Sequence, residues 1–297
     1  MGAGAIDVVI PTCQRGERLL ATLDVLAPPP GSLVIVVDQT PDHPAVVREQ
    51  LEARSTRGEL QWLRLAHPSI PAAMNRGLLA SRSPVVLFLD DDVVPHEGLY
   101  RAHLAAQRPP VGVVAGRVVQ PWDVGREPRF IPDGLSRWAS NRRAHVGDFI
   151  GANFSVDRRV ALNVGGFDEN FVGAAYRYEI EFAERVRATG RTILFEPEAS
   201  VRHLQEPAGG TRSYGHFLRT ARPHHAVGEY YFLLRTRATE DRWARLLTHP
   251  LRAVATRHHL RAPWWIPLTL VAELRAFAWA LRLERAGPRL LRPVTGH

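Results

Sequence analysis

Short apolar runs alternate with segments of helical periodicity over the first ninety residues. Four runs are rich in Val, Ile and Leu, which is typical of buried strands. Between the first two, apolar residues recur at 19, 20, 23 and 26, a helical spacing that "PPPG" then ends. Strands that alternate with helices predict a parallel sheet with crossover helices, a Rossmann-like half. The predicted strands are 7–12, 33–40, 60–66 and 85–90, and the further helices are 42–54 and 71–81.

The second half has a different pattern. Residues 149–171 read as a strand, a short helix from Asp157 and a Gly-Gly turn, and 178–190 as a helix that stops at a glycine. Beyond about 212 the pattern is helical, basic and aromatic. We therefore expect an α/β catalytic domain and a C-terminal helical extension. The catalytic domain is expected to span 1–212, with a nucleotide-binding half 1–95 and an acceptor-binding half 96–212, and the extension to span 213–297. Two further segments of the domain, 111–120 and 191–203, read as extended.

Composition places the chain among globular proteins. It has 297 residues, of which 45% are hydrophobic and 23% charged. The single cysteine, Cys13, excludes an internal disulfide and fits a reducing compartment. The first residues, "MGAGAIDVVIPT", have no basic segment before the apolar run, so they do not read as a secretory signal. We therefore expect a cytoplasmic protein.

The positive charge is concentrated in the last third. All 38 basic residues are arginine, and residues 201–297 hold 16 of them against 6 acidic residues, a net charge of +10. Residues 1–200 carry a net charge of −2. Such asymmetry suggests that the last third faces phosphates, of lipid or of nucleic acid. The chain contains no recognisable nucleic-acid-binding module, so we expect no nucleic-acid partner.

Candidate chemistry appears in the stretch "PVVLFLDDDVVP", where three carboxylates end an apolar run. Side chains two apart in an extended chain point the same way, so Asp90 and Asp92 face one side and Asp91 another. Paired carboxylates are ligands suited to Mg²⁺ or Mn²⁺. Thr12 and Asp38 also end strands, and ligands bind beyond the carboxyl ends of parallel strands. The alternatives are an acidic loop exposed to water, or one that caps a helix beginning near Pro95.

Together these segments resemble the family 2 glycosyltransferases of the GT-A fold. "FLDDDVVP" matches the Asp-x-Asp motif of that family, and "GGFDENF" matches its Gly-Gly-Phe-Asp-Glu turn. The resemblance implies a Rossmann-like sandwich with a mostly parallel central sheet. It covers about 200 residues. The other segments, in the expected order, are "VIPTCQR" (9–15), "VVDQT" (36–40), "PAAMNRGLLAS" (71–81), "YEIEFAERVRATG" (178–190) and "FEPEASVRH" (195–203).

The resemblance also implies roles for individual residues. Asp92 would be the principal ligand of Mn²⁺ or Mg²⁺ at the donor diphosphate, Asp90 would contact the ribose or a metal-bound water, and His203 would be a further ligand. The residues expected at the nucleotide are Pro11, Thr12, Arg15, Asp38, Asn75, Asp90 and Asp91. Those expected at the acceptor are Asp168, Glu181 and Trp138. Structural alternatives stay open for five of these residues: packing for His203, a turn for Asp38, solvation for Arg15, a helix position for Asn75 and a turn cap for Asp168.

The expected catalytic base is Glu179, by its register in the segment 178–190. Tyr178 stands where the family usually has Glu, which is a departure. Glu181 lies two residues further on and therefore points to a different side of the helix, so only one of the two faces the site. A base opposite the leaving diphosphate implies direct displacement with inversion of configuration. A solvent-facing charged helix is the other interpretation.

The C-terminal segment has two interpretations. Residues 263–283 are apolar but carry Glu273, Arg275 and Arg282, which makes a membrane-spanning helix unfavourable. Trp264 and Trp265 beside arginines suit a helix at a membrane surface. The same segment equally suits a helix packed on the catalytic domain or on a partner.

The sequence thus predicts a metal-dependent, inverting hexosyl- or deoxyhexosyltransferase. Its donor would be a UDP-, dTDP- or GDP-linked sugar, and its acceptor a glycan or a polyprenyl-linked glycan. The setting would be bacterial exopolysaccharide, cell-surface glycan or glycolipid assembly, with peripheral contact to the inner face of the plasma membrane through 213–297. The alternatives are a catalytically impaired scaffold, suggested by Tyr178, and a sugar nucleotidyltransferase, which would need a more glycine-rich first loop than "PTCQRGER".

Overall fold

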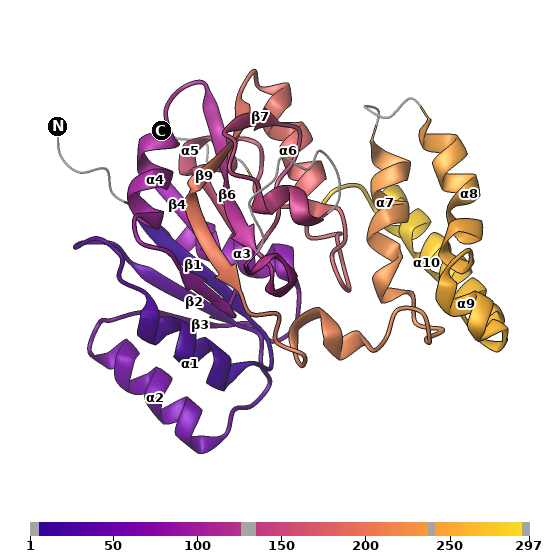
Figure 1. The fold of residues 1–297 in the computed structure, drawn as a ribbon, viewed down its shortest axis with the longest axis horizontal. Helices are drawn as coiled ribbons and strands as arrows, with labels where there is room; N and C mark the ends of the chain where they lie inside the picture. The colour runs from indigo at the N-terminus through magenta and orange to yellow at the C-terminus, as the bar shows by residue number, and fades with distance from the viewer. Residues whose placement is uncertain (1–5, 126–134, 237–240, 293–297) are drawn as a thin grey trace.

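The computed structural model describes residues 6–125, 135–236 and 241–292, and it has a mixed α/β fold around one sheet (Figure 1). Within these described residues the sheet has nine strands, eight in the order β3-β2-β1-β4-β8-β6-β9-β5 and a ninth, β7, that pairs with β9. The strands are β1 Ile6–Thr12, β2 Val34–Asp38, β3 Gln61–Arg64, β4 Val85–Leu89, β5 Val93–Pro95, β6 Val111–Val119, β7 Ala144–Val146, β8 Asn153–Asp157 and β9 Thr192–His203.

Six of these strands run in one direction, so the sheet is mostly parallel, as predicted. The first four strands, β1, β2, β3 and β4, pair with one another in parallel. β6 pairs in parallel with β9, and β8 runs antiparallel between β4 and β6. β2 and β4 are buried along their whole length, which explains why they read as continuous apolar runs. The four strands predicted in the first half are confirmed to within a few residues at each end.

Helices cover the sheet and fix the ends of its strands. α1 and α2 lie side by side (Figure 1), and α3 packs against β1 and β2. The approach of α3 is close because Gly77 lacks a Cβ, which would collide with Val9. The helices of this part are α1 Gly16–Val25, α2 Ala45–Thr56, α3 Ile70–Ala80, α4 Leu99–Ala106, α5 Arg158–Asn163 and α6 Tyr178–Ala188, with 3-10 turns at Pro121–Asp123, Leu135–Ala139 and Gly210–Tyr214.

The last third forms a group of helices beside the sheet, at one end of the molecule (Figure 1). α7 is its core, because Tyr230, Tyr231 and Phe232 are buried, and α8 and α10 pack against it. Among the described residues, every helix is too short or too polar to cross a bilayer. The elements are η4 Pro223–His225, α7 Val227–Arg235, α8 Arg242–Val254, α9 Arg257–Arg261, η5 Pro263–Trp265 and α10 Ile266–Ala286.

Candidate active site

Asp90, Asp92 and His203 meet just past the carboxyl ends of β4 and β9. Their ligand atoms all lie within 4.8 Å of one another. His203 Nε2 lies 3.1 Å from Asp92 Oδ1 and 3.6 Å from Asp90 Oδ2. Asp92 is fully buried, whereas the Asp90 side chain keeps 40% of its surface exposed. The three residues therefore form a cluster that is anchored on one side and open on the other.

Asp91 points the other way, as the alternation along the strand predicted. Its Oδ2 accepts a hydrogen bond from Thr12 Oγ1 at 2.7 Å, and its Oδ1 accepts one from Arg15 Nη1 at 3.0 Å. Burial raises the pKa of Asp91 to about 6, against the opposing charge of Arg15. Asp91 thus ties the loop after β4 to the loop after β1. The three aspartates do not cap α4, which begins at Leu99 after Gly98 and has no side-chain cap.

The residues of the cluster fit a divalent cation. Asp92 Oδ1 is buried and finds no hydrogen-bond donor among the described residues, which is costly for a carboxylate oxygen unless a positive ligand occupies the site. His203 Nδ1 lies 3.0 Å from Gln120 Oε1, an acceptor, so Nδ1 carries the proton and Nε2 presents its lone pair to the carboxylates. Two carboxylates and an imidazole are a donor set that suits Mn²⁺ and accommodates Mg²⁺.

Electrostatics keep the cluster ready to bind a cation. Burial alone would raise the pKa of Asp92, but the adjacent imidazole of His203 and the charge of Arg15, 3.7 Å away, act against burial and help to hold that pKa below its usual range. The backbone N–H of Glu206 contributes by donating to Asp92 Oδ2 at 2.7 Å. Asp92 is therefore ionised at neutral pH, as a metal ligand must be.

A pocket of about 390 Å³ opens beside this cluster, and Glu179 lies in its wall. Asp90, Asp91 and His203 line the same pocket. Burial raises the pKa of Glu179 to about 8, with a further contribution from the charge of Asp90. A carboxylate tuned toward neutral pH beside a metal-binding cluster has the properties of a general base.

The first turn of α6 is held in place from two sides. Gly151 leaves room for it, since a Cβ at this position would collide with Tyr178 Oη and reach within 3.3 Å of Glu179 Oε1. Arg177, which precedes the helix, is left-handed at φ 78° and forms an ion pair with Glu229 of α7. The position of Glu179 is therefore fixed by contacts on both sides of the first turn of α6.

The expected acceptor residues lie elsewhere, outside the lining of this pocket. Glu181 makes two hydrogen bonds to Arg185, at 2.8 and 2.7 Å, on another side of α6. Asp168 accepts from Tyr231 Oη at 2.7 Å and from the backbone N–H of Arg289 at 2.9 Å. Trp138 is buried against Phe195, with ring centroids 6.0 Å apart. The contacts of all three are those of structural residues.

Two of the expected nucleotide residues are also engaged within the protein. Asp38 is fully buried, and its carboxylate accepts from His43 Nε2 at 2.6 Å, Trp62 Nε1 at 3.0 Å and the backbone N–H of Thr40 at 2.9 Å. Asn75 bonds both backbone groups of Phe167, at 2.7 and 2.8 Å, and so holds the Gly-Gly turn. Pro11, Thr12, Arg15, Asp90 and Asp91 do line the pocket.

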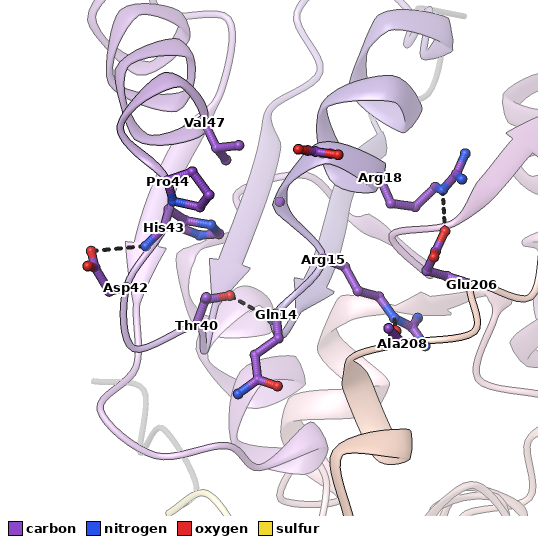
Figure 2. Close-up of a pocket in the computed structure, with 12 residues that line it drawn as sticks. Gln14, Arg15, Arg18, Thr40, Asp42, His43, Pro44, Val47, Glu206 and Ala208 are labelled. Carbon is purple, nitrogen blue, oxygen red and sulfur yellow. Dashed lines mark hydrogen bonds and ion pairs between the residues drawn. The ribbon is translucent and has the colours of Figure 1, made fainter.

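A second cavity, of about 530 Å³, lies on the other side of the first loop, between the starts of α1 and α2 (Figure 2). Arg15 lines both cavities. Arg18 and Glu206 form an ion pair across one side, and Asp42 and His43 lie on the other (Figure 2). Asp90 and Asp92 are not part of this lining, so the smaller pocket is the candidate active site.

Comparison with known proteins places this geometry in a family. The model of "Glycosyl transferase family 2" matches residues 7–165, more than half of the chain. The chain belongs to glycosyl transferase family 2. The pre-mycofactocin glycosyltransferases of two Mycobacterium tuberculosis strains are 30% identical to it over 208 residues. That match covers 67% of this chain and 42% of the relatives, so the chain spans less than half of their length.

Solved structures share the GT-A fold with this family 2 chain. The mannosyltransferase PcManGT of Pyrobaculum calidifontis, in complex with GDP-Man and Mn²⁺, has a TM-score of 0.56 at 20% identity, over 95% of this chain and 79% of its own. TarS of S. aureus with UDP-GlcNAc has a TM-score of 0.60 at 16% identity, over 95% and 83%. GalNAc-T7 with UDP, GalNAc and Mn²⁺ has a TM-score of 0.59 at 12% identity, over 94% and 55%.

Sequence reasoning missed three residues of this family 2 site. Gln120 follows β6 and orients His203, and the rule that found Thr12 and Asp90 at strand ends also applies to it. Gln39 and Tyr214 line the pocket. Gln39 directly follows Asp38, so the strand-end rule points to it as well. Tyr214 ends the 3-10 turn Gly210–Tyr214, and no sequence pattern marked it as a site residue.

Proposed function

We propose that this protein is an inverting, metal-dependent glycosyltransferase that moves a hexosyl or deoxyhexosyl group from a nucleoside diphosphate sugar to an acceptor hydroxyl. The observation that carries the proposal is the position of Glu179 in the same pocket as Asp90 and His203. A base and a metal-binding cluster in one pocket are what this reaction needs. The solved neighbours that hold GDP-Man, UDP-GlcNAc or UDP with GalNAc support a nucleotide-linked donor.

In this mechanism the residues of the chain divide the work. Glu179 takes the proton of the acceptor hydroxyl while that oxygen forms a bond to the anomeric carbon. The bond between this carbon and the diphosphate oxygen breaks, and its electron pair leaves with the diphosphate, so the configuration inverts. Asp90, Asp92 and His203 would hold Mn²⁺ or Mg²⁺, which supplies charge neutralisation for the departing diphosphate. Arg15 and Thr12, which line the same pocket and contact Asp91, would help to position the donor.

The acceptor belongs to the same proposal. We infer a glycan or polyprenyl-linked acceptor in bacterial exopolysaccharide, cell-surface glycan or glycolipid assembly. The location would be cytoplasmic and peripheral on the inner face of the plasma membrane. Support comes from the basic, aromatic composition of residues 213–297, which suits a phosphate-bearing, lipid-linked substrate.

The decisive experiment is a screen of UDP-, dTDP- and GDP-linked sugars for release of nucleoside diphosphate, with Mn²⁺, with Mg²⁺ and with a chelator. We expect release from one donor class, abolished by the chelator and by Asp92→Asn. The matched control is Asp42→Asn, whose side chain is exposed and lies in the other cavity. Metal-independent release that persists in Asp92→Asn would contradict the mechanism. Failure of every donor, with tight nucleotide binding retained, would favour a scaffold.

A further inference from the structure

Helix α8 packs on the molecule through polar side chains together with one apolar residue, Leu246. Arg245 forms an ion pair with Glu229 of α7 at 3.0 Å, and His249 forms one with Glu273 of α10 at 2.8 Å. On the remaining surface of the helix, Trp243, Leu247 and Leu251 are 57%, 74% and 66% exposed. Ordinary amphipathic helices do the reverse and bury the apolar stripe. The orientation of α8 therefore leaves its apolar side for something outside this chain.

The next elements also expose large apolar side chains. Leu260 of α9 is 83% exposed, and Trp264 of η5 is 69% exposed. The first half of α10 adds three apolar side chains that recur every third residue. α8, α9 and the start of α10 lie together at the end of the molecule remote from the first half of the sheet (Figure 1). We call the eight residues the apolar end: Trp243, Leu247, Leu251, Leu260, Trp264, Leu268, Val271 and Leu274.

The charge around the apolar end is positive. Residues 242–286 contain eight arginines and two glutamates, a net charge of +6. One of the glutamates, Glu273, is buried and accepts a hydrogen bond from Tyr230 Oη at 2.7 Å, so it contributes little to the outer surface. The arginines that stay exposed between the apolar residues are Arg252, Arg257, Arg261 and Arg275.

We propose that the apolar end is a docking surface for an anionic lipid bilayer. Trp and Leu side chains among arginines are the composition of helices that lie in a membrane interface, with the apolar side in the acyl boundary and the arginines at the headgroups. Charge complementarity selects this occupant, since the inner leaflet carries negative lipids. A protein partner would have to match both the large apolar side chains and the arginines interspersed among them.

The docking surface is connected to the pocket by direct packing. Tyr214, in the pocket wall, stacks on His224 with ring centroids 4.6 Å apart. His224 in turn contacts Trp279 of α10, at 5.7 Å. A bilayer bound at the apolar end would therefore lie on the same group of packed helices that contacts the pocket wall. This inference deepens the membrane location in the proposed function, and it implies a lipid-linked acceptor.

The test is co-flotation of the full chain with vesicles, which needs neither donor nor turnover. The vesicles are phosphatidylcholine with about one third phosphatidylglycerol, compared with pure phosphatidylcholine. The test variant is Leu247→Ser with Leu251→Ser. The matched control is Val46→Ser with Leu79→Ser, two apolar residues exposed on α2 and α3. Because all four side chains are exposed, we expect unfolding temperatures close to that of the wild type.

We expect the wild type and the control to float with anionic vesicles, and the test variant to bind about tenfold more weakly. Arg257→Gln should weaken binding about fivefold, and raising salt to about 1 M should weaken it further. Equal binding to neutral vesicles, or no loss in the test variant, would overturn the proposal. So would a wild type that ignores vesicles but self-associates through Leu247 and Leu251, which would assign the surface to a second copy. A wild type that binds anionic vesicles but transfers no sugar would count against the proposed function alone.

Discussion

Gln120 Oε1 lies 3.0 Å from Nδ1 of His203, and this contact decides which ring nitrogen faces the two carboxylates. An acceptor at Nδ1 fixes the proton there and directs Nε2 toward Asp92. The metal-binding cluster therefore depends on a residue that lies outside it.

We expect Gln120→Leu to lower the affinity for Mn²⁺ about tenfold or more, because the imidazole loses the group that orients it. Gln120→Glu keeps an acceptor at Nδ1 and should bind Mn²⁺ nearly as well as the wild type. Calorimetric titration of Mn²⁺ into both variants measures this. Equal affinities for the leucine and glutamate variants would show that the contact from Gln120 does not orient His203 for metal binding.

Glu179 and Glu181, both in the first half of α6, should respond differently to substitution by glutamine. Glu179→Gln should lower the rate of transfer about 10²- to 10⁴-fold, since the general base is lost. Glu181→Gln should leave transfer nearly intact and cost about 1–2 kcal/mol of unfolding free energy, because Arg185 loses its paired carboxylate. Turnover and thermal unfolding of both variants separate the two roles. An inactive Glu181→Gln with wild-type stability would reverse the assignment.

Gly151 gives a steric test of the same pocket. Gly151→Ala should lower both the transfer rate and the unfolding temperature, because its Cβ would collide with Tyr178 Oη and approach Glu179. Gly147→Ala is the matched control in the same loop, since its Cβ would meet only the flexible end of Arg187, at 3.3 Å. We expect the control to behave as the wild type. Transfer that survives in Gly151→Ala would mean that Glu179 need not hold its observed position.

The buried His103 predicts a pH dependence of stability. Burial lowers its pKa to about 4, and Nε2 donates to Asn153 Oδ1 at 2.9 Å. The unfolded chain, with a pKa near 6.5, binds the proton first, so stability is complete above about pH 6.5 and is lost as pH falls toward 4. The loss amounts to about 3 kcal/mol at most.

Denaturant unfolding between pH 7 and pH 4 measures this dependence, and His103→Gln is the comparison. The variant starts from lower stability but should lose less of it on acidification, because it lacks the imidazole that takes up a proton on unfolding. All other titrating groups are common to both proteins, so their contributions cancel when the two pH profiles are subtracted. Parallel pH profiles for the two proteins would show that His103 titrates normally in the folded state.

Most of the sheet could be predicted because its strands are buried on both faces and therefore read as apolar runs. β5 and β7 were not predicted, since three residues are too few to show a periodicity. α4 was not predicted at its true start either, because Gly98, left-handed at φ 85°, replaces the usual capping residue.

The candidate site was predictable where it depends on neighbours along the chain. The opposite orientation of Asp91 follows from strand alternation alone. The sequestration of Asp38 does not, because its partner Trp62 comes from another strand. The orientation of α6, which places Glu179 and not Glu181 in the pocket wall, likewise depends on Glu229 and Gly151, far away in sequence. Tertiary contacts of this kind leave no local pattern.

Glu229 pairs with Arg177 ahead of α6 and with Arg245 of α8 at once. A truncation at residue 212 would remove this carboxylate and also Tyr231, the partner of Asp168. Arg177, which precedes the helix of Glu179, would lose its ion-pair partner, and Asp168 would lose the hydroxyl that donates to it. Residues 1–212 are thus unsuited to fusion with a different C-terminal segment, and chimeric enzymes made from this protein should contain the entire chain.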